Sequence, residues 1–264
     1  MPMHPKLLKT LELEAKYADE PQNLLAKTTP EPTSTHTSQE AKLAPKITTI
    51  AAKDKGNITQ AELSRNFANN VNSIEQLVEA LNNFEGCNLK HTSTNTVVYD
   101  GVTNADVMLI GEAPGANEDL KGIPFCGDSG QLMDVYLNTI NLARDKNIFI
   151  TNSVYWRPPA NRKPTASEMA ICLPWLEKTI ALVQPKIIIL IGAVAVQTIL
   201  NQTIAMAKIR RRYFDYSNSY LTQPITTTAL YHPSYLLRSP GQKKTCWFDL
   251  LHLEKKLYQL EIFK

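Results

Sequence analysis

The chain has 264 residues, 43% of them hydrophobic, and its formal net charge is only +3. This length allows one sizeable α/β domain with an appendage and leaves little room for a second full domain. No apolar run reaches the roughly 18 residues of a membrane span, and the first residues lack the apolar core of a secretory signal, so we expect a cytoplasmic protein. The 4 cysteines form no C-x-x-C pair, which argues against a disulfide framework and a zinc knuckle.

The N-terminal part of the chain is predicted to be a short helix followed by a linker. Leucines recur at helical spacing within residues 6–17. Residues 30–49 are rich in Thr, Pro, Ser and Lys and have almost nothing to bury, which predicts a disordered linker. We therefore divide the chain into an N-terminal helical segment at 1–28, a linker at 29–56 and a globular domain at 57–264. The first segment is a candidate for binding a partner protein.

The globular domain shows alternating helical and strand patterns. A helix is predicted over residues 59–84, where apolar residues recur at steps of three and four. Continuous apolar runs predict buried strands at 106–110, 147–151, 186–191 and 225–231. Helical patterns alternate with these runs at 130–141, 165–183, 193–200 and 245–260. We therefore predict a three-layer α/β/α sandwich with a central, mainly parallel four-stranded sheet, in which ligands bind beyond the carboxyl ends of the strands.

The loops after these strands carry unusual sequences. Gly-Glu-Ala-Pro-Gly follows the first strand at 111–115, Asn152 and an Arg-Pro-Pro run follow the second, and His-Pro-Ser-Tyr-Leu-Leu-Arg follows the fourth at 232–238. A Gly-x-Pro-Phe segment lies at 122–125. With these motifs in this order, the chain resembles the uracil-DNA glycosylase superfamily, most closely its family 4, over roughly residues 84–260. The resemblance implies an enzyme that flips uracil out of DNA and hydrolyses its N-glycosidic bond, which starts base excision repair.

The same resemblance implies roles for individual residues. His232 matches the catalytic histidine, which hydrogen-bonds the uracil carbonyl oxygen as negative charge builds there. Asn152 matches the residue that reads the uracil edge, because one amide offers both a donor and an acceptor. Phe125 matches the aromatic that stacks on the flipped base. Glu118 matches the position that crowds the C5 edge of uracil and so excludes thymine, and Glu112 is expected to shape the pocket.

Ala113 marks a departure from the family 1 enzymes. Those enzymes have an aspartate at this position of the first loop, and it orients the attacking water. With alanine there, no carboxylate is an obvious general base. We therefore predict that stabilisation of the leaving uracil by His232 and loop amides carries most of the rate, with water captured late.

Several residues are expected to hold the DNA. Leu236 is the predicted wedge that fills the gap left by the flipped base, with Leu237 beside it and Arg238 on a phosphate. Further contacts to the DNA backbone are predicted for Ser129, Arg162, Ser234 and the basic run at 210–212. Residues 101–264 carry 18 Lys and Arg against 13 Asp and Glu, which favours a polyanionic partner.

Typical family 4 glycosylases bind a [4Fe–4S] cluster through four cysteines. The four positions correspond here to Phe84, Cys87, Trp156 and Cys172. Cluster ligation usually needs four donors, and only two thiols remain. We therefore expect no cofactor and predict that apolar packing around these four positions replaces the cluster.

Two other functions stay open at this stage. The chain could be a glycosylase for other deaminated bases, such as hypoxanthine or xanthine, although Asn152 argues against this. It could also be a non-catalytic DNA-binding relative, although the presence of Glu112, Phe125, Asn152 and His232 argues against that. A nucleotide-metabolising enzyme is disfavoured because neither common phosphate-binding glycine pattern occurs. We expect a monomer that acts on uracil-containing DNA.

Overall fold

The computed structural model describes residues 58–263, so the predictions for 1–28 and 29–56 lie outside the described residues. The strands are β1 (Asp100–Gly101), β2 (Val107–Gly111), β3 (Ile148–Asn152), β4 (Ile187–Ile191), β5 (Phe214–Tyr216) and β6 (Ile225–Leu230). The α-helices are α2 (Gln60–Asn69), α3 (Ile74–Asn83), α4 (Ala116–Lys121), α5 (Asp128–Asn138), α6 (Ala166–Val183), α7 (Ala193–Leu200), α8 (Met206–Ile209), α9 (Pro233–Arg238) and α10 (Lys243–Gln259). Short 3₁₀ helices lie at η1 (Asn88–Thr92), η2 (Pro159–Asn161) and η3 (Pro240–Gln242).

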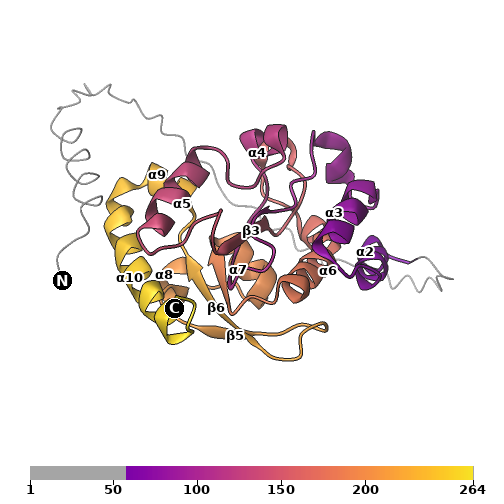
Figure 1. The fold of residues 1–264 in the computed structure, drawn as a ribbon. Coiled ribbons are helices and arrows are strands. Elements are labelled where there is room, and N and C mark those ends of the chain that lie inside the picture. The colour runs from indigo at the N-terminus through magenta and orange to yellow at the C-terminus, as the bar shows by residue number, and fades with distance from the viewer. Residues whose placement is uncertain (1–57, 264) are drawn as a thin grey trace, which may run out of the picture. The chain divides into compact units, whose positions relative to one another are not determined.

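The sheet has six strands in the order β1-β3-β2-β4-β6-β5 (Figure 1). The four predicted strands form its parallel centre, but the prediction of a four-stranded sheet was wrong, because an antiparallel strand is added at each edge. These edge strands escaped the sequence pattern for a physical reason. β1 has 2 residues and β5 has 3, and both are partly exposed, so neither forms a continuous apolar run.

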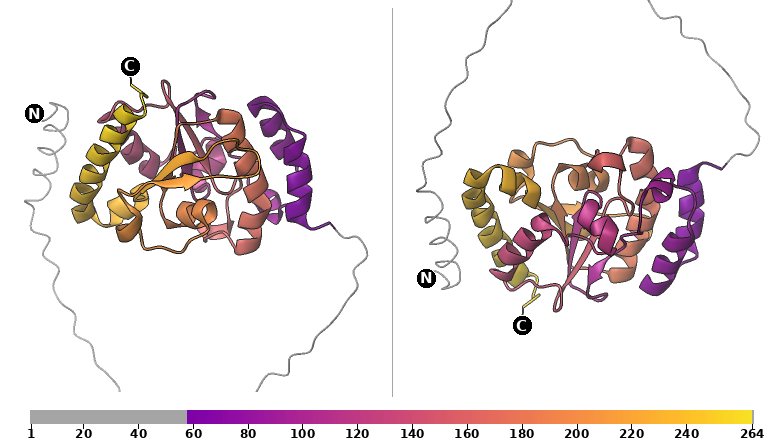
Figure 2. Two further views of the ribbon diagram at one scale, coloured as in Figure 1. Left: turned by 90° about the horizontal axis from the view of Figure 1, so that it is seen from below. Right: turned by 90° about the horizontal axis from the view of Figure 1, so that it is seen from above.

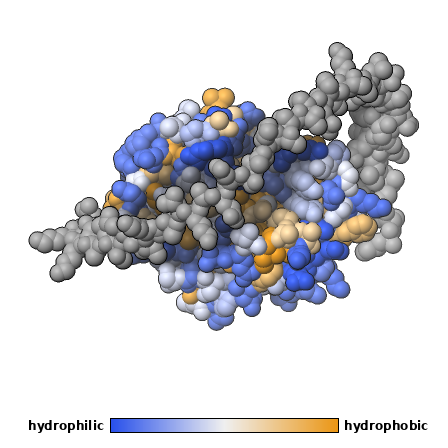
Figure 3. Space-filling model, turned by 180° about the vertical axis from the view of Figure 1, so that it is seen from behind, coloured by the Kyte–Doolittle hydropathy of each residue, from blue (hydrophilic) through white to orange (hydrophobic). Residues whose placement is uncertain are grey.

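Helices cover both faces of the sheet, which gives the predicted three layers (Figure 2). One face packs against α5, α9 and α10, with Met133, Leu236 and Leu250 among the buried contacts. The other face packs against α6, α7 and α8. Seen from behind, hydrophilic side chains cover most of the described surface (Figure 3). Among the described helices, none combines the length and the apolar character needed to cross a membrane.

The predicted helix over residues 59–84 is in fact two helices, α2 and α3. Thr59 caps α2 in a capping box with Glu62. Ser73 caps α3, because its side chain accepts a hydrogen bond from the backbone N–H of Gln76. The two helices carry apolar residues in compatible phase, so their periodicity looks continuous, whereas the serine cap marks the true start of the second helix.

Three short helices occupy segments for which no helix was predicted: α8, with 4 residues, and α4 and α9. The last two have 6 residues each, which is too short for a periodic pattern to be recognised. Pro233 stands in the first turn of α9, where its missing N–H costs nothing. Both α4 and α9 follow parallel strands of the sheet, and both therefore lie at the edge where ligands are expected.

Candidate active site

The carboxyl ends of the parallel strands bring the predicted motif residues to one edge of the sheet. Gly111 at the end of β2 is paired with Asn152 at the end of β3. β6 lies two strands from β2 in the sheet and ends at Leu230, two residues before His232. Gly192, which follows β4, lies close to His232, because a Cβ atom added to this glycine would lie 3.1 Å from the Cβ of His232.

Phe125, Asn152 and His232 converge at this edge. A Cβ on Gly111 would lie 2.4 Å from Oδ1 of Asn152 and 2.5 Å from Cζ of Phe125. Glycine is therefore required at position 111 for the other two side chains to approach. The rings of Phe125 and His232 have their centroids 5.7 Å apart at an angle of 33°. The structure thus brings together the three residues on which the predicted site depends.

Asn152 is only 2% exposed, yet its side-chain amide makes no hydrogen bond with any other group in the described part of the chain. The residue is largely buried, yet its amide atoms are not among the fully buried polar atoms that lack a partner, so the amide remains accessible to a small ligand or to water. Its neighbours in sequence are fully engaged, since Thr151 Oγ1 donates to the carbonyl of Val98 and Ser153 Oγ donates to the carbonyl of Gly111. Asn152 therefore has one donor and one acceptor group free for a planar polar ligand.

His232 is the N-cap of α9, and its own capping contact fixes its tautomer. Its Nδ1 accepts a hydrogen bond from the backbone N–H of Ser234 at 3.2 Å and lies 2.8 Å from Ser234 Oγ. A nitrogen that accepts from a backbone amide carries no proton, so the neutral ring has its proton on Nε2. Burial, with a smaller contribution from Arg238, lowers the pKa of His232 to about 4. At neutral pH the site therefore contains an uncharged imidazole with a donor at Nε2.

Glu118 links the first loop to the Phe125 segment. Its Oε1 accepts hydrogen bonds from the backbone N–H groups of Cys126 and Gly127, each at 2.9 Å, and its Oε2 accepts from Gly115 at 3.1 Å. This anchoring was not foreseen from the sequence, where Glu118 was considered only for contact with the base. The acidic residue in the first turn of α4 was the available signal, because such residues often bond backbone amides there.

Glu112 and Ala113 lie in the first loop, which is tied to the end of β3. The carbonyl of Glu112 accepts from the backbone N–H of Val154 at 3.1 Å. Burial raises the pKa of the Glu112 carboxyl group, and nearby Lys163 opposes this shift. Ala113 packs against the apolar cluster beside α6. The place held by an aspartate in family 1 is thus partly buried and apolar.

The predicted wedge residue Leu236 lies in the core and does not face solvent in this structure. Leu236 is 1% exposed and packs with the cluster on the α5 and α10 side of the sheet. Leu237 is 43% exposed, and Arg238 after it is also exposed. Successive residues of a helix point in different directions, so α9 turns Leu236 inward and Leu237 outward. Leu237 is the leucine available to DNA.

The other predicted DNA contacts are placed in different ways. Ser129 is half-buried in the first turn of α5, and Ser234 holds His232. Arg162 pairs with Glu168 through two hydrogen bonds of 2.8 and 2.6 Å. Within the basic run, Arg210 does not face solvent, because it forms a buried ion pair with Asp249.

The four positions of the family's cluster cysteines meet in one buried apolar group beside α6. The rings of Phe84 and Trp156 are stacked with centroids 6.3 Å apart, and Trp175 packs edge-on against Phe84 at 5.4 Å. Cys87 and Cys172 are both fully buried; a hydrogen bond between them lowers the pKa of Cys87, and burial raises the pKa of Cys172. Over residues 58–263, no group of three or more metal-ligating side chains is close enough to hold an ion. This donor set does not fit a four-thiolate cluster.

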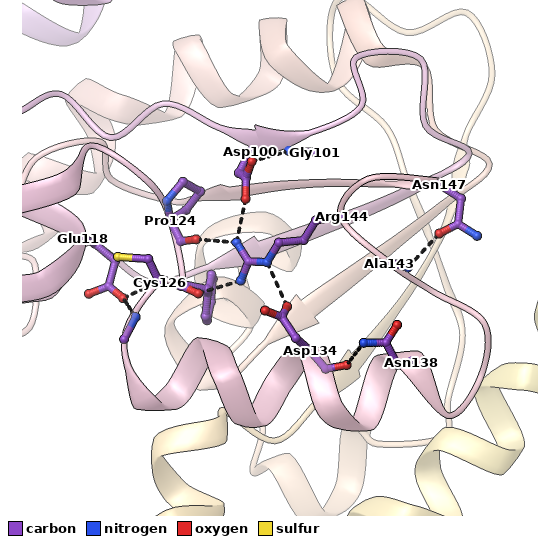
Figure 4. A network of polar contacts seen from close by, with 12 residues as sticks. Asp100, Gly101, Glu118, Pro124, Cys126, Asp134, Asn138, Ala143, Arg144 and Asn147 are labelled. Atoms are coloured by element: carbon purple, nitrogen blue, oxygen red, sulfur yellow. Dashed lines mark hydrogen bonds and ion pairs between the residues drawn. The ribbon is translucent and has the colours of Figure 1, made fainter. Parts of the chain in front are cut away.

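Arg144 is a polar residue near the site that sequence reasoning missed. It lies between α5 and β3, and its guanidinium group donates to the backbone carbonyls of Pro124 and Phe125. Figure 4 shows the group beside Pro124. Nothing in the sequence signals this role, because a single arginine in a polar turn is usually a surface residue. Its partners come from segments that are distant in the chain.

Comparison with known proteins agrees with this geometry. The family model for the uracil DNA glycosylase superfamily matches residues 98–252. The type-4 uracil-DNA glycosylase of Sulfurisphaera tokodaii is 34% identical over 197 residues, covering 73% of this chain and 86% of the relative. That of Archaeoglobus fulgidus is 32% identical over 172 residues, 64% of this chain and 85% of the relative. A type-5 enzyme of Pyrobaculum aerophilum is 28% identical over 54% of this chain and 67% of its own length. The chain therefore belongs to the uracil DNA glycosylase superfamily.

Proposed function

We propose that the protein excises uracil from DNA by hydrolysing the N-glycosidic bond and so starts base excision repair. The observation that carries this proposal is the convergence of Phe125, Asn152 and His232 at one edge of the sheet. Together they offer a flat apolar surface, an unpaired amide and an uncharged N–H donor. These are the groups that a flipped pyrimidine needs for stacking, for edge recognition and for stabilisation of its carbonyl oxygen.

Recognition of the base falls to Phe125 and Asn152. Phe125 stacks on the flipped ring, and the Asn152 amide donates to the uracil O4 and accepts from N3–H. Cytosine presents the opposite pattern at this edge and leaves the buried amide unpaired, which is costly. Glu118 lies against the C5 edge, where a thymine methyl group would disturb the carboxylate that binds three backbone amides.

Bond cleavage depends on His232. As the bond between C1′ and N1 breaks, its electron pair moves onto uracil, and the sugar becomes an oxocarbenium-like cation. The Nε2–H of His232 donates to the carbonyl oxygen that gains this charge. Water then attacks C1′, loses a proton to the solvent and completes the abasic product. Ala113 offers no base for this water, so stabilisation of the leaving group carries most of the rate.

The neutral form of His232 leads to a prediction for pH dependence. The folded pKa is lowered to about 4, so the functional imidazole persists as the pH falls through 6 and is lost only near pH 4. Protonation there would set an Nδ1–H against the N–H of Ser234. We expect the single-turnover rate to lose activity on the acidic side only near pH 4, and to do so also in the Glu112→Gln variant, which removes the first-loop carboxyl group whose pKa burial raises. A limb near the ordinary histidine value of about 6.5 would contradict the assignment.

Leu237 is proposed to fill the gap left by the flipped base. The Leu237→Ala variant should excise uracil from a U·A duplex about tenfold more slowly, while excision from single strands stays nearly unchanged, because only the duplex must be unstacked. Leu236→Ala is the matched variant, and it should instead lower the free energy of unfolding by about 2–5 kcal/mol. Excision rates on both substrates and thermal unfolding measure these effects. An equal loss on both substrates would argue against a wedge.

We also propose that the protein works without an iron–sulfur cluster. Phe84 and Trp156 stand where two ligands would be needed, and their rings fill the space beside Cys87 and Cys172. The purified protein, made under conditions that load a four-cysteine relative, should contain no stoichiometric iron and show no absorbance near about 400 nm. Iron that copurifies with the protein and is required for its activity would overturn this proposal.

An excision assay tests the function directly. Oligonucleotides with one uracil, as single strand, U·A duplex and U·G duplex, are incubated with the protein, and abasic sites are cleaved with alkali. The proposal expects cleavage at uracil in at least one of the three. Matched oligonucleotides with hypoxanthine or xanthine test the alternative specificity, and binding without cleavage of any substrate would favour a non-catalytic DNA-binding relative.

A further inference from the structure

The Phe125 segment adopts a backbone conformation that needs outside support. Phe125 has a φ of 52°, in the left-handed region that residues other than glycine rarely adopt. The first turn of α5 packs closely against this residue, because a Cβ atom added to Gly130 would lie 1.6 Å from the Phe125 carbonyl oxygen. Unfavourable conformations of this kind persist only where surrounding contacts enforce them.

Arg144 supplies such contacts on the carbonyl side of the segment. Its Nη2 donates to the Phe125 carbonyl at 2.6 Å, and its Nη1 donates to the Pro124 carbonyl at 2.8 Å. Figure 4 shows the guanidinium group between the Pro124 carbonyl and the carboxylates of Asp100 and Asp134. On the opposite side, Glu118 binds the amides of Cys126 and Gly127. The segment is thus held by a cation at its carbonyls and an anion at its amides.

Two carboxylates from different layers fix the guanidinium group itself. Nη1 also donates to Asp100 Oδ2 in β1, and Nε donates to Asp134 Oδ1 in α5, both at 2.8 Å. These contacts use four of the five N–H groups of the arginine, whose side chain is only 20% exposed. An arginine so engaged has little capacity left for a DNA phosphate. Its contacts instead define the position of one backbone segment.

We propose that Arg144 is a positioning residue that sets the Phe125 ring against the flipped base and acts on catalysis only through that ring. This inference rests on the proposed function. Loss of the two carbonyl contacts frees the backbone to leave the left-handed conformation, which would move the ring out of the stacking position. A lysine cannot replace the arginine fully, because a single ammonium group cannot match the planar fork that spans two carbonyls and two carboxylates.

A double-mutant cycle tests this inference. Arg144→Met and Phe125→Ala are made singly and together, and two quantities are measured: the single-turnover rate of uracil release and the inhibition constant of free uracil. Arg144→Met alone should slow release by roughly 10- to 100-fold and weaken inhibition by free uracil. In the Phe125→Ala background, Arg144→Met should change either quantity by less than about twofold, because the ring through which Arg144 acts is already absent. Arg144→Lys should fall between wild type and Arg144→Met.

Arg65→Met is the matched control, since it removes a partly buried ion pair between α2 and Glu177 of α6 without touching the site. It should leave inhibition by free uracil unchanged. If Arg144→Met does not fold, the cycle is run with Asp134→Ala, which removes only the acceptor of the Nε contact. Equal effects of the substitution with and without the Phe125 ring would overturn the inference. Wild-type protein that releases no uracil would refute the proposed function instead, so the two failures are distinct.

Discussion

His232→Ala is expected to lower the single-turnover rate of uracil release by about 10²- to 10³-fold, because it removes the donor aimed at the oxygen that gains charge. The effect should fall on the chemical step. Binding of uracil-containing DNA should change little, since the neutral ring contributes no charge to phosphate binding. Quench-flow measurement of base release, with binding measured separately by fluorescence anisotropy, separates the two.

His252→Ala on α10 is the control for this substitution. His252 is exposed and stacks on Tyr213, and neither residue belongs to the predicted site. It should leave the rate of release unchanged. Because His232 also caps α9, His232→Gln is a useful second variant that keeps a polar side chain at the cap. Near-normal turnover in both His232 variants would contradict the role of this residue in stabilising the leaving uracil.

Asn152→Asp is expected to reduce uracil release by at least about 10²-fold. The substitution keeps the shape of the side chain but replaces the donor with an acceptor, which then faces the O4 oxygen of uracil. A carboxylate beside a base that is gaining negative charge raises the barrier further. Rates on uracil-containing oligonucleotides, measured under single-turnover conditions, quantify the loss.

Asn138→Asp adds the same charge at the exposed end of α5 and serves as the control. It should leave the excision rate within about twofold of wild type, since exposed charges at a distance are screened. If Asn152→Asp were no slower than this control, the amide would not read the base. Asn152→Ala, which leaves both uracil groups unpaired without adding charge, should lie between the two.

The centre of the fold could be predicted from the sequence because its signals are local. The run at 186–191 is continuous and β-branched, and it is strand β4 almost to the residue. The edge strands could not be found, because β1 and β5 exist through pairing with distant neighbours and not through their own composition. The break at Ser73 was present in the sequence as a capping residue, but the apolar periodicity on both sides concealed it.

The residues of the site also differ in whether the sequence could predict them. Motif order was enough to bring Phe125, Asn152 and His232 together. Which of Leu236 and Leu237 is exposed could not be predicted, because it depends on the rotation of α9, and a helix of 6 residues gives no periodic pattern from which to read it. Arg144 could not be found at all, since its partners lie 10 to 44 residues away in sequence.

The pairing of Gly111 with Asn152 means that the hydrogen bonds between β2 and β3 set the relative positions of these two residues of the site. Side chains of a strand alternate between its faces, so a slip of a single residue between β2 and β3 would turn each one to the wrong side. Insertion of one alanine within either strand should therefore disrupt the site while leaving the net charge unchanged. The same insertion in the mostly exposed loop at 201–205, between α7 and α8, meets no such constraint from strand pairing. Evolutionary tolerance to length changes should differ sharply between these two stretches of chain.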